Sequence, residues 1–253
     1  MTRAPAPGFN NYFGPQAERY SEIRPHYPAA FLLYIANLGP ARRCVWDCGT
    51  GNGQAATGLA EHFERVVATD PSTEMIAHAV PHDRVTYRVA GFDSGLASAT
   101  ADMVTVAQAM HWFDLPPFLR EVRRVLVPGG VLAAWCYSTC NVAPEVDDVL
   151  LHYYSLTLRS FWPPERRHTD DGYRSLDLPL DEIRAPALEM VEEWTLRQFV
   201  RYVRTWSGTN KCIAALGEAP VLAFEEALRE RWGPEERRRR VTWPIHCRLG
   251  PLR

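Results

Sequence analysis

An acidic residue stands directly before a turn rich in glycine. The segment 45–54 leads from an apolar stretch through Asp47 into three alternate glycines, Gly49, Gly51 and Gly53. Glycine tolerates unusual φ angles and lets a ligand approach the backbone closely, and open α/β sheets bind their ligands at such strand ends. A carboxylate at this entrance repels a pyrophosphate but attracts an ammonium or sulfonium group. We therefore expect a bound ligand that carries positive charge.

The spacing of the glycines bears on the class of nucleotide. A dinucleotide fingerprint reads G-x-G-x-x-G, whereas this chain reads G-x-G-x-G, which disfavours a nicotinamide cofactor. The next apolar stretch ends in Asp70, about 20 residues beyond the first glycine, where an acidic side chain hydrogen-bonds the ribose hydroxyls of a nucleoside. The spacing thus indicates an adenosine-like ligand.

A sheet is needed to position these residues. Five apolar runs have the length of strands, and segments with helical spacing separate most of them; the runs are 44–48, 65–70, 83–91, 101–110 and 131–137. Strands that alternate with helices at this pitch predict βαβ units and a parallel sheet. We expect an α/β, doubly wound fold.

The pattern changes after about residue 140. Longer helical stretches cover 145–161 and 196–206, and a polar loop over 163–181 lies between them. Two further runs, 187–196 and 241–250, alternate well enough to be closing strands. This half of the chain is predicted to form a lid.

Composition limits the partners of the chain. Its 253 residues carry 28 basic and 30 acidic side chains, for a formal charge of −2, which is not the basic balance typical of nucleic-acid-binding proteins. No run reaches the ~20 apolar residues of a membrane-spanning helix, and the N-terminal segment lacks a signal-peptide pattern. The six cysteines form no C-x2-C pair, so no metal site is predicted. We expect a cytoplasmic monomer or homodimer whose partner is a small molecule, not nucleic acid or membrane.

Taken together, the motifs occur in the order typical of class I S-adenosylmethionine (SAM) dependent methyltransferases. These motifs are the glycine triplet, Asp70, the acidic turn after 83–91 and Pro128-Gly129-Gly130, and the chain resembles that family over roughly 40–137. Other segments are similar to the small-molecule, methyltransferase type 11 like branch that includes trans-aconitate methyltransferases; they are 19–28, 106–114, 202–208 and 241–250. The resemblance implies a Rossmann-like, mostly parallel sheet with an antiparallel last strand, a helical lid, and SAM as cofactor.

The resemblance also implies one methyltransferase domain over 1–253. Its parts would be an N-terminal cap over 1–40, a SAM-binding core over 41–140, a mainly helical substrate lid over 141–235 and a closing strand over 236–253.

Cofactor contacts follow from the resemblance position by position. The glycine triplet would wrap the methionine part of SAM, Asp47 would orient its amino group, and Asp70 would hold the ribose. The turn 90–93 would lie along the adenine, with the contact open between the Phe92 backbone and the Asp93 side chain. Arg24 would pair with the cofactor carboxylate. The remaining implied contacts are Tyr20, Thr50, Pro71, Gln108 and Ala109.

The acceptor side is less specified. Methyl transfer is an in-line displacement in which the protein mostly supplies positioning. His111 is the candidate base for a hydroxyl acceptor, and a carboxylate acceptor needs no base. Candidate acceptor contacts are Tyr12, Tyr27, His111, Trp112, Tyr137 and Trp206, and the charges to test for an acidic acceptor are Arg159, Arg204 and Lys211.

We therefore expect a SAM-dependent methyltransferase that acts on an oxygen of a small organic molecule, with a carboxylate favoured over a hydroxyl. The alternatives are a non-catalytic SAM-binding protein and a nicotinamide-dependent oxidoreductase.

Overall fold

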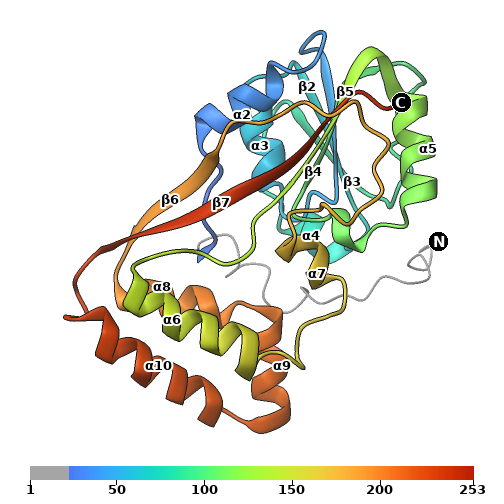
Figure 1. The fold of residues 1–253 in the computed structure, drawn as a ribbon. Helices are drawn as coiled ribbons and strands as arrows, with labels where there is room; N and C mark the ends of the chain where they lie inside the picture. The colour runs from blue at the N-terminus through green and yellow to red at the C-terminus, as the bar shows by residue number, and fades with distance from the viewer. Residues whose placement is uncertain (1–22) are drawn as a thin grey trace.

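In the computed structural model, which describes residues 23–253, seven strands form one sheet in the order β3-β2-β1-β4-β5-β7-β6 (Figure 1). The strands are β1 (Cys44–Cys48), β2 (Arg65–Asp70), β3 (Val85–Val89), β4 (Ala101–Ala107), β5 (Leu126–Cys136), β6 (Leu188–Trp194) and β7 (Arg239–Gly250). The first five strands pair in parallel, whereas β7 runs antiparallel to both β5 and β6. The predicted doubly wound α/β fold with an antiparallel last strand is confirmed.

Helices cover both faces of the sheet. They are α2 (Ala29–Ala36), α3 (Gln54–Ala60), α4 (Thr73–Ala77), η2 (Met110–Trp112), α5 (Leu115–Val125), α6 (Pro144–His152), η3 (Tyr153–Thr157), α7 (Arg166–Asp170), α8 (Leu196–Arg204), α9 (Ser207–Leu216) and α10 (Ala219–Trp232). Figure 1 shows α2 and α3 on one face and α5 on the other. In α5, Phe118, Val122 and Val125 recur at helical spacing and are buried, so this stripe of the helix packs on the sheet.

Two elements differ from the sequence prediction. β5 begins at Leu126 and not near 131, because Pro128–Gly130 form an irregularity inside the strand: the register with β4 changes between the pairs Ala101↔Leu126 and Met103↔Val131. The helix predicted over 145–161 is not continuous, since α6 ends at His152 and a π-helical turn, η3, follows. Such turns are rare and frequently occur at functional sites.

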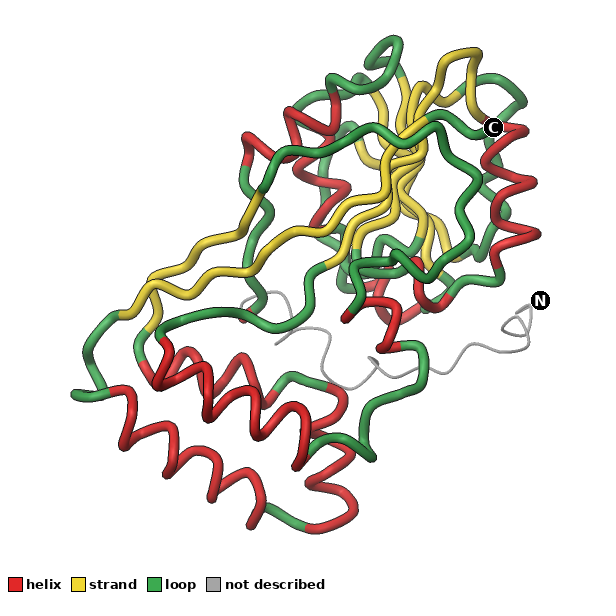
Figure 2. The backbone as a smooth tube through the Cα atoms, viewed as in Figure 1, coloured by secondary structure: helices red, strands yellow, loops and turns green. Residues whose placement is uncertain are grey.

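The strand β7 joins the sheet to the helical half of the chain. Residues 239–245 pair with β6, and residues 246–250 pair with β5. In Figure 2 the strands β6 and β7 extend from the rest of the sheet toward the helices α6, α8, α9 and α10. This helical part falls within the segment predicted to be a lid. No helix within residues 23–253 is long and apolar enough to cross a membrane.

Candidate functional site

A cavity of about 400 Å³ lies at the carboxyl ends of β1, β2 and β4. It brings together many of the predicted site residues: Arg24, Tyr27, Gly49, Thr50, Gly51, Asp70, Pro71, Phe92, Gln108, Ala109, Trp112 and Tyr137. Gly91, which also lines the cavity, belongs to the predicted turn 90–93. Sequence reasoning missed the other lining residues: Cys48, Asn52, Gln54, Ala55, Ser72, Met75, Ala107, Phe113 and Asp114. Each missed residue lies close in the sequence to a predicted one, so proximity to a motif was the available signal.

The glycine turn depends on left-handed backbone geometry. Gly49, Gly51 and Gly53 have φ angles of +73°, +57° and +88°, which side chains other than that of glycine rarely adopt. A Cβ added to Gly49 would lie 2.6 Å from the Cβ of Ala109, so the turn packs directly against the end of β4. Gly53 is the N-cap of α3 and does not line the cavity.

Asp70 closes the same turn. Its Oδ2 accepts a hydrogen bond from the Gly51 N–H at 2.9 Å, and its Oδ1 accepts one from the Ser72 N–H at 2.9 Å. Burial raises the pKa of Asp70, and the Ser72 and Gly51 donors oppose that effect. Each carboxylate oxygen retains a further acceptor position, so Asp70 can accept hydrogen bonds from the hydroxyls of a bound ribose.

Asp47 lies behind the cavity wall and not on it. The side chain is fully buried, and Oδ1 accepts a hydrogen bond from the Thr105 hydroxyl at 2.7 Å. Burial raises the pKa of Asp47 to about 6, although the Thr50 and Thr105 hydroxyls oppose the shift. Asp47 therefore contributes a negative charge beneath the glycine turn. Because the surroundings are buried and have a low dielectric constant, that charge interacts strongly with a cationic ligand.

Gln108 joins the ends of β4 and β5. Its backbone has a φ of +57°, and its side chain bonds to both the N–H and the carbonyl of Tyr137. A strained non-glycine residue at a strand end commonly marks a functional position. Gln108 and Tyr137 form one fixed section of the cavity wall.

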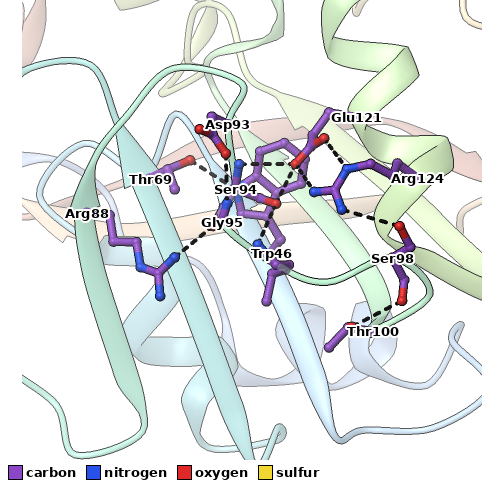
Figure 3. Close-up of polar contacts among 11 residues, drawn as sticks. Trp46, Thr69, Arg88, Asp93, Ser94, Gly95, Ser98, Thr100, Glu121 and Arg124 are labelled. Carbon is purple, nitrogen blue, oxygen red and sulfur yellow. Dashed lines mark hydrogen bonds and ion pairs between the residues drawn. The ribbon is translucent and has the colours of Figure 1, made fainter.

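The loop after β3 contains both residues predicted as adenine contacts, Phe92 and Asp93, and only one of them faces the cavity. Phe92 lines the cavity, and its ring centroid is 5.0 Å from that of Phe113. Asp93 does not line it: Oδ1 accepts a hydrogen bond from the Gly95 N–H, beside the Ser94–Glu121 contact (Figure 3). This arrangement favours Phe92 over the Asp93 side chain as the adenine contact.

His111 is held beside the cavity. Its neighbour Trp112 lines the cavity, but His111 does not, and its Nδ1 lies 3.2 Å from the Tyr173 hydroxyl. Burial, together with the positive charges of Arg166 and His168, lowers the pKa of His111 to about 3. The imidazole is therefore neutral at physiological pH and a weak base.

The remaining predicted contacts are dispersed. Arg24 lines the cavity and places its guanidinium carbon 5.4 Å from the centroid of the Tyr202 ring. Trp206 is buried in the helical part and does not line the cavity, and Arg204 forms ion pairs with Glu218 and Glu225. Tyr12 and Tyr20 lie outside the described residues.

The residues of the cavity fit SAM. The carboxylates of Asp47 and Asp70 supply the negative charge that a sulfonium and an ammonium group need. The glycine turn leaves room for the methionine part, and Phe92, Phe113 and Met75 supply an apolar wall for an adenine ring. Among residues 23–253, no three His, Cys, Asp or Glu side chains form a group that could hold a metal ion.

Comparisons with known proteins identify the family of the chain. A family model described as "Methyltransferase domain" matches residues 46–134. A methyltransferase of Dictyostelium discoideum is 30% identical over 225 residues, which cover 87% of this chain and 86% of the relative. A structure described as a type II methyltransferase from Anaeromyxobacter dehalogenans is 47% identical, with a TM-score of 0.85 over 90% of this chain and 97% of that one. A methyltransferase structure from Anabaena variabilis, 16% identical with a TM-score of 0.51 over 90% of this chain and 99% of that one, shares the fold.

The fold and the cavity define a class I methyltransferase. The chain belongs to the methyltransferase family and is a SAM-dependent methyltransferase. The nicotinamide-dependent alternative is thereby set aside.

Proposed function

We propose that this chain transfers the methyl group of SAM to an oxygen atom of a small organic molecule, with a carboxylate favoured over a hydroxyl. The observation that carries the proposal is the state of His111. A hydroxyl acceptor must lose its proton during transfer, and a general base works best when its pKa lies near the operating pH. His111, with a pKa of about 3 and its Nδ1 beside Tyr173, is poorly suited to that role.

A carboxylate acceptor removes the need for a base. A carboxyl group of ordinary pKa, about 4, is ionised at neutral pH. Bound SAM supplies a methyl group on a positively charged sulfur. The acceptor oxygen contributes the electron pair of the new O–CH₃ bond, the C–S bond breaks with its pair left on sulfur, and no proton is released. The chain then has to orient the acceptor and exclude water.

The size of the cavity supports a small acceptor. Its volume of about 400 Å³ lies at the lower end of the range for small-molecule sites, and the cofactor would occupy a large share of it. Tyr27, Trp112 and Tyr137 line the cavity with aromatic surface, which suits an acceptor with an apolar body.

Incubation with SAM and a panel of small acids, alcohols and amines tests the proposal. We expect S-adenosylhomocysteine release with the acids and a methyl ester as product, identified by mass. Transfer only to nitrogen, or only to nucleic acid, would overturn the acceptor assignment. SAM binding without release across the panel would favour the non-catalytic alternative.

A substitution of Asp70 tests whether SAM binds in this cavity. Asp70→Ala removes charge-assisted hydrogen bonds and should weaken SAM binding by roughly 10- to 150-fold. Asp83→Ala is the matched control, because Asp83 is exposed in the loop before β3. A change below twofold in Asp70→Ala would mean that the ribose lies elsewhere.

A further inference from the structure

A partly buried arginine that the sequence did not single out lies between the core and the helical part. Arg166 is the first residue of α7, and its side chain is only 23% exposed. Figure 1 shows α7 between the sheet and the helices α6 and α9. A charge in such a position requires partners, and those partners show what the guanidinium faces.

One edge of the guanidinium is fixed. Nε of Arg166 donates to the Tyr154 hydroxyl at 2.8 Å and to Oδ1 of Asp170 at 3.2 Å. Oδ1 of Asp170 also accepts hydrogen bonds from the hydroxyls of Ser138 and Tyr154, at 2.5 and 2.6 Å. The Asp170 carboxylate is thus shared among three donors, and Arg166 meets it through Nε alone.

The other edge keeps its hydrogen-bonding capacity. Nη2 reaches the Ser138 hydroxyl only at 3.5 Å, and within the described residues Nη1 has no hydrogen-bond acceptor. A guanidinium offers five donors in a planar fork that matches a carboxylate. Two terminal nitrogens therefore remain available for an anion.

Aromatic rings hold the guanidinium in place. Its carbon lies 5.0 Å from the centroid of Trp162 and 5.5 Å from that of Tyr154. Both tyrosines lie in the π-helical turn η3: Tyr153 stacks on Phe224 of α10, while the next residue, Tyr154, faces Arg166. The rings restrict the side chain and form an apolar surround, which strengthens an ion pair made there.

Arg166 does not itself line the cavity, but three observations connect it to the part of the wall formed by Trp112 and Tyr137. Ser138 directly follows Tyr137, which lines the cavity. The positive charge of Arg166 acts on His111, whose neighbour Trp112 also lines it. Tyr173, which follows α7, donates its N–H to the carbonyl of His168 in α7 and places its hydroxyl beside His111 in η2. Arg166 is thus attached to the same wall as Trp112 and Tyr137, away from the glycine turn.

We infer that Arg166 binds a carboxylate of the methyl acceptor, and that the acceptors of this enzyme are small organic acids with an aryl or alkyl body next to Trp162. This inference rests on the proposed function and assigns it a recognition residue. Arg204, which the sequence suggested, is neutralised by two glutamates. Arg159 is exposed on the helical part.

Calorimetry on the S-adenosylhomocysteine complex tests the inference. The probes are phenylacetate and 3-phenylpropionate, each compared with its uncharged primary amide. The native chain should bind each acid at least about tenfold more tightly than its amide, the effect of one charge-assisted contact. Arg166→Met should reduce that ratio to below about twofold, whereas Arg166→Lys, which keeps the charge, should retain part of it.

The matched control is Arg167→Met, since Arg167 is the exposed neighbour on α7, and its ratio should equal that of the native chain. Equal binding of acid and amide by the native chain, an unchanged ratio in Arg166→Met, or no binding of either acid at about 10 mM would each overturn the inference. Failure of S-adenosylhomocysteine to bind would instead count against the proposed function. The same acid and amide titrations without it would still decide the role of Arg166.

Discussion

Gln108 and Tyr137 bond to each other twice across the ends of two neighbouring parallel strands. Nε2 of Gln108 donates to the Tyr137 carbonyl at 2.8 Å, and the Tyr137 N–H donates to Oε1 of Gln108 at 3.1 Å. The amide thereby completes the β4–β5 ladder at the point where the strands separate to form the cavity. The left-handed backbone of Gln108 is maintained by this pair of hydrogen bonds, which offsets its conformational strain.

Gln108→Glu should break one of the two hydrogen bonds. Glutamate keeps the acceptor for the Tyr137 N–H but places a second oxygen against the Tyr137 carbonyl. We expect the free energy of unfolding to fall by about 1–3 kcal/mol and SAM binding to weaken. Gln198→Glu is the control, because in the α8 capping box the side chain of Gln198 only accepts hydrogen bonds, from the N–H and the hydroxyl of Thr195. Denaturant unfolding and calorimetry measure both effects; equal behaviour of the two variants would contradict the prediction.

Gly49 and Gly129 have nearly the same φ angle, so alanine substitutions at the two positions distinguish the effect of backbone strain from the effect of a close contact. Gly49 and Gly129 have φ angles of +73° and +78°, but only Gly49 has atoms within 4 Å of an added Cβ. Alanine at either position costs about 1–2 kcal/mol of backbone strain. Gly49→Ala should in addition displace Ala109 and weaken SAM binding by more than about tenfold, whereas Gly129→Ala should bind SAM normally. Comparable loss of SAM binding in both variants would mean that the turn does not contact the cofactor.

The glycine turn and Asp70 could be predicted from the sequence because they belong to one βαβ unit. The strand order brings β1 next to β2, so residues about 20 apart in the chain meet at one sheet edge. His111 was located correctly at the end of β4, but its environment was not foreseen. Its pKa is set partly by Arg166 and its orientation by Tyr173, which come from the helical half of the chain.

The helical half was predictable only as helices. The contacts around Arg166 involve a π-helical turn, which carries no sequence signal. They also require Asp170, Tyr154 and Ser138 to meet from three separate segments. Helical spacing reports which side of a helix is apolar, not which of its polar residues meet. For that reason the sequence does not distinguish Arg166 from the other cations of this half of the chain.

The buried carboxyl of Asp47 should make SAM affinity depend on pH. Its pKa is raised to about 6, so the carboxyl is partly protonated at pH 5.5 and ionised at pH 7. The cofactor ammonium, with an α-amino pKa near 8, stays positive over this range. We expect SAM to bind more tightly as the pH rises from 5 to 7, and Asp47→Asn to lose that dependence in calorimetry.

The Asp47 carboxyl should also make the free energy of unfolding depend on pH, but in the opposite direction to SAM affinity. Because the pKa is higher in the folded than in the unfolded chain, the folded chain holds an extra proton between about pH 4 and 6, and stability falls as the pH rises through that window. Asp47→Asn should therefore raise the free energy of unfolding at pH 8 by up to about 3 kcal/mol, with a smaller gain at pH 4.5. Asp83→Asn, an exposed carboxylate, is the control. Destabilisation of Asp47→Asn at pH 8 would show that the ionised form is favoured in the fold.

Substitution of His111 distinguishes a carboxylate acceptor from a hydroxyl acceptor. With a pKa of about 3, the imidazole does not titrate between pH 5 and 8, so the rate at saturating SAM should show no descending acid limb near pH 6.5. His111→Gln should lower the rate less than about tenfold, through altered positioning of Trp112, because general-base catalysis contributes about 10²–10⁴-fold where it operates. His152→Gln, on the exposed side of α6, should leave the rate unchanged. A loss above 100-fold in His111→Gln, together with an acid limb that disappears in the variant, would assign His111 as the base and a hydroxyl as the acceptor.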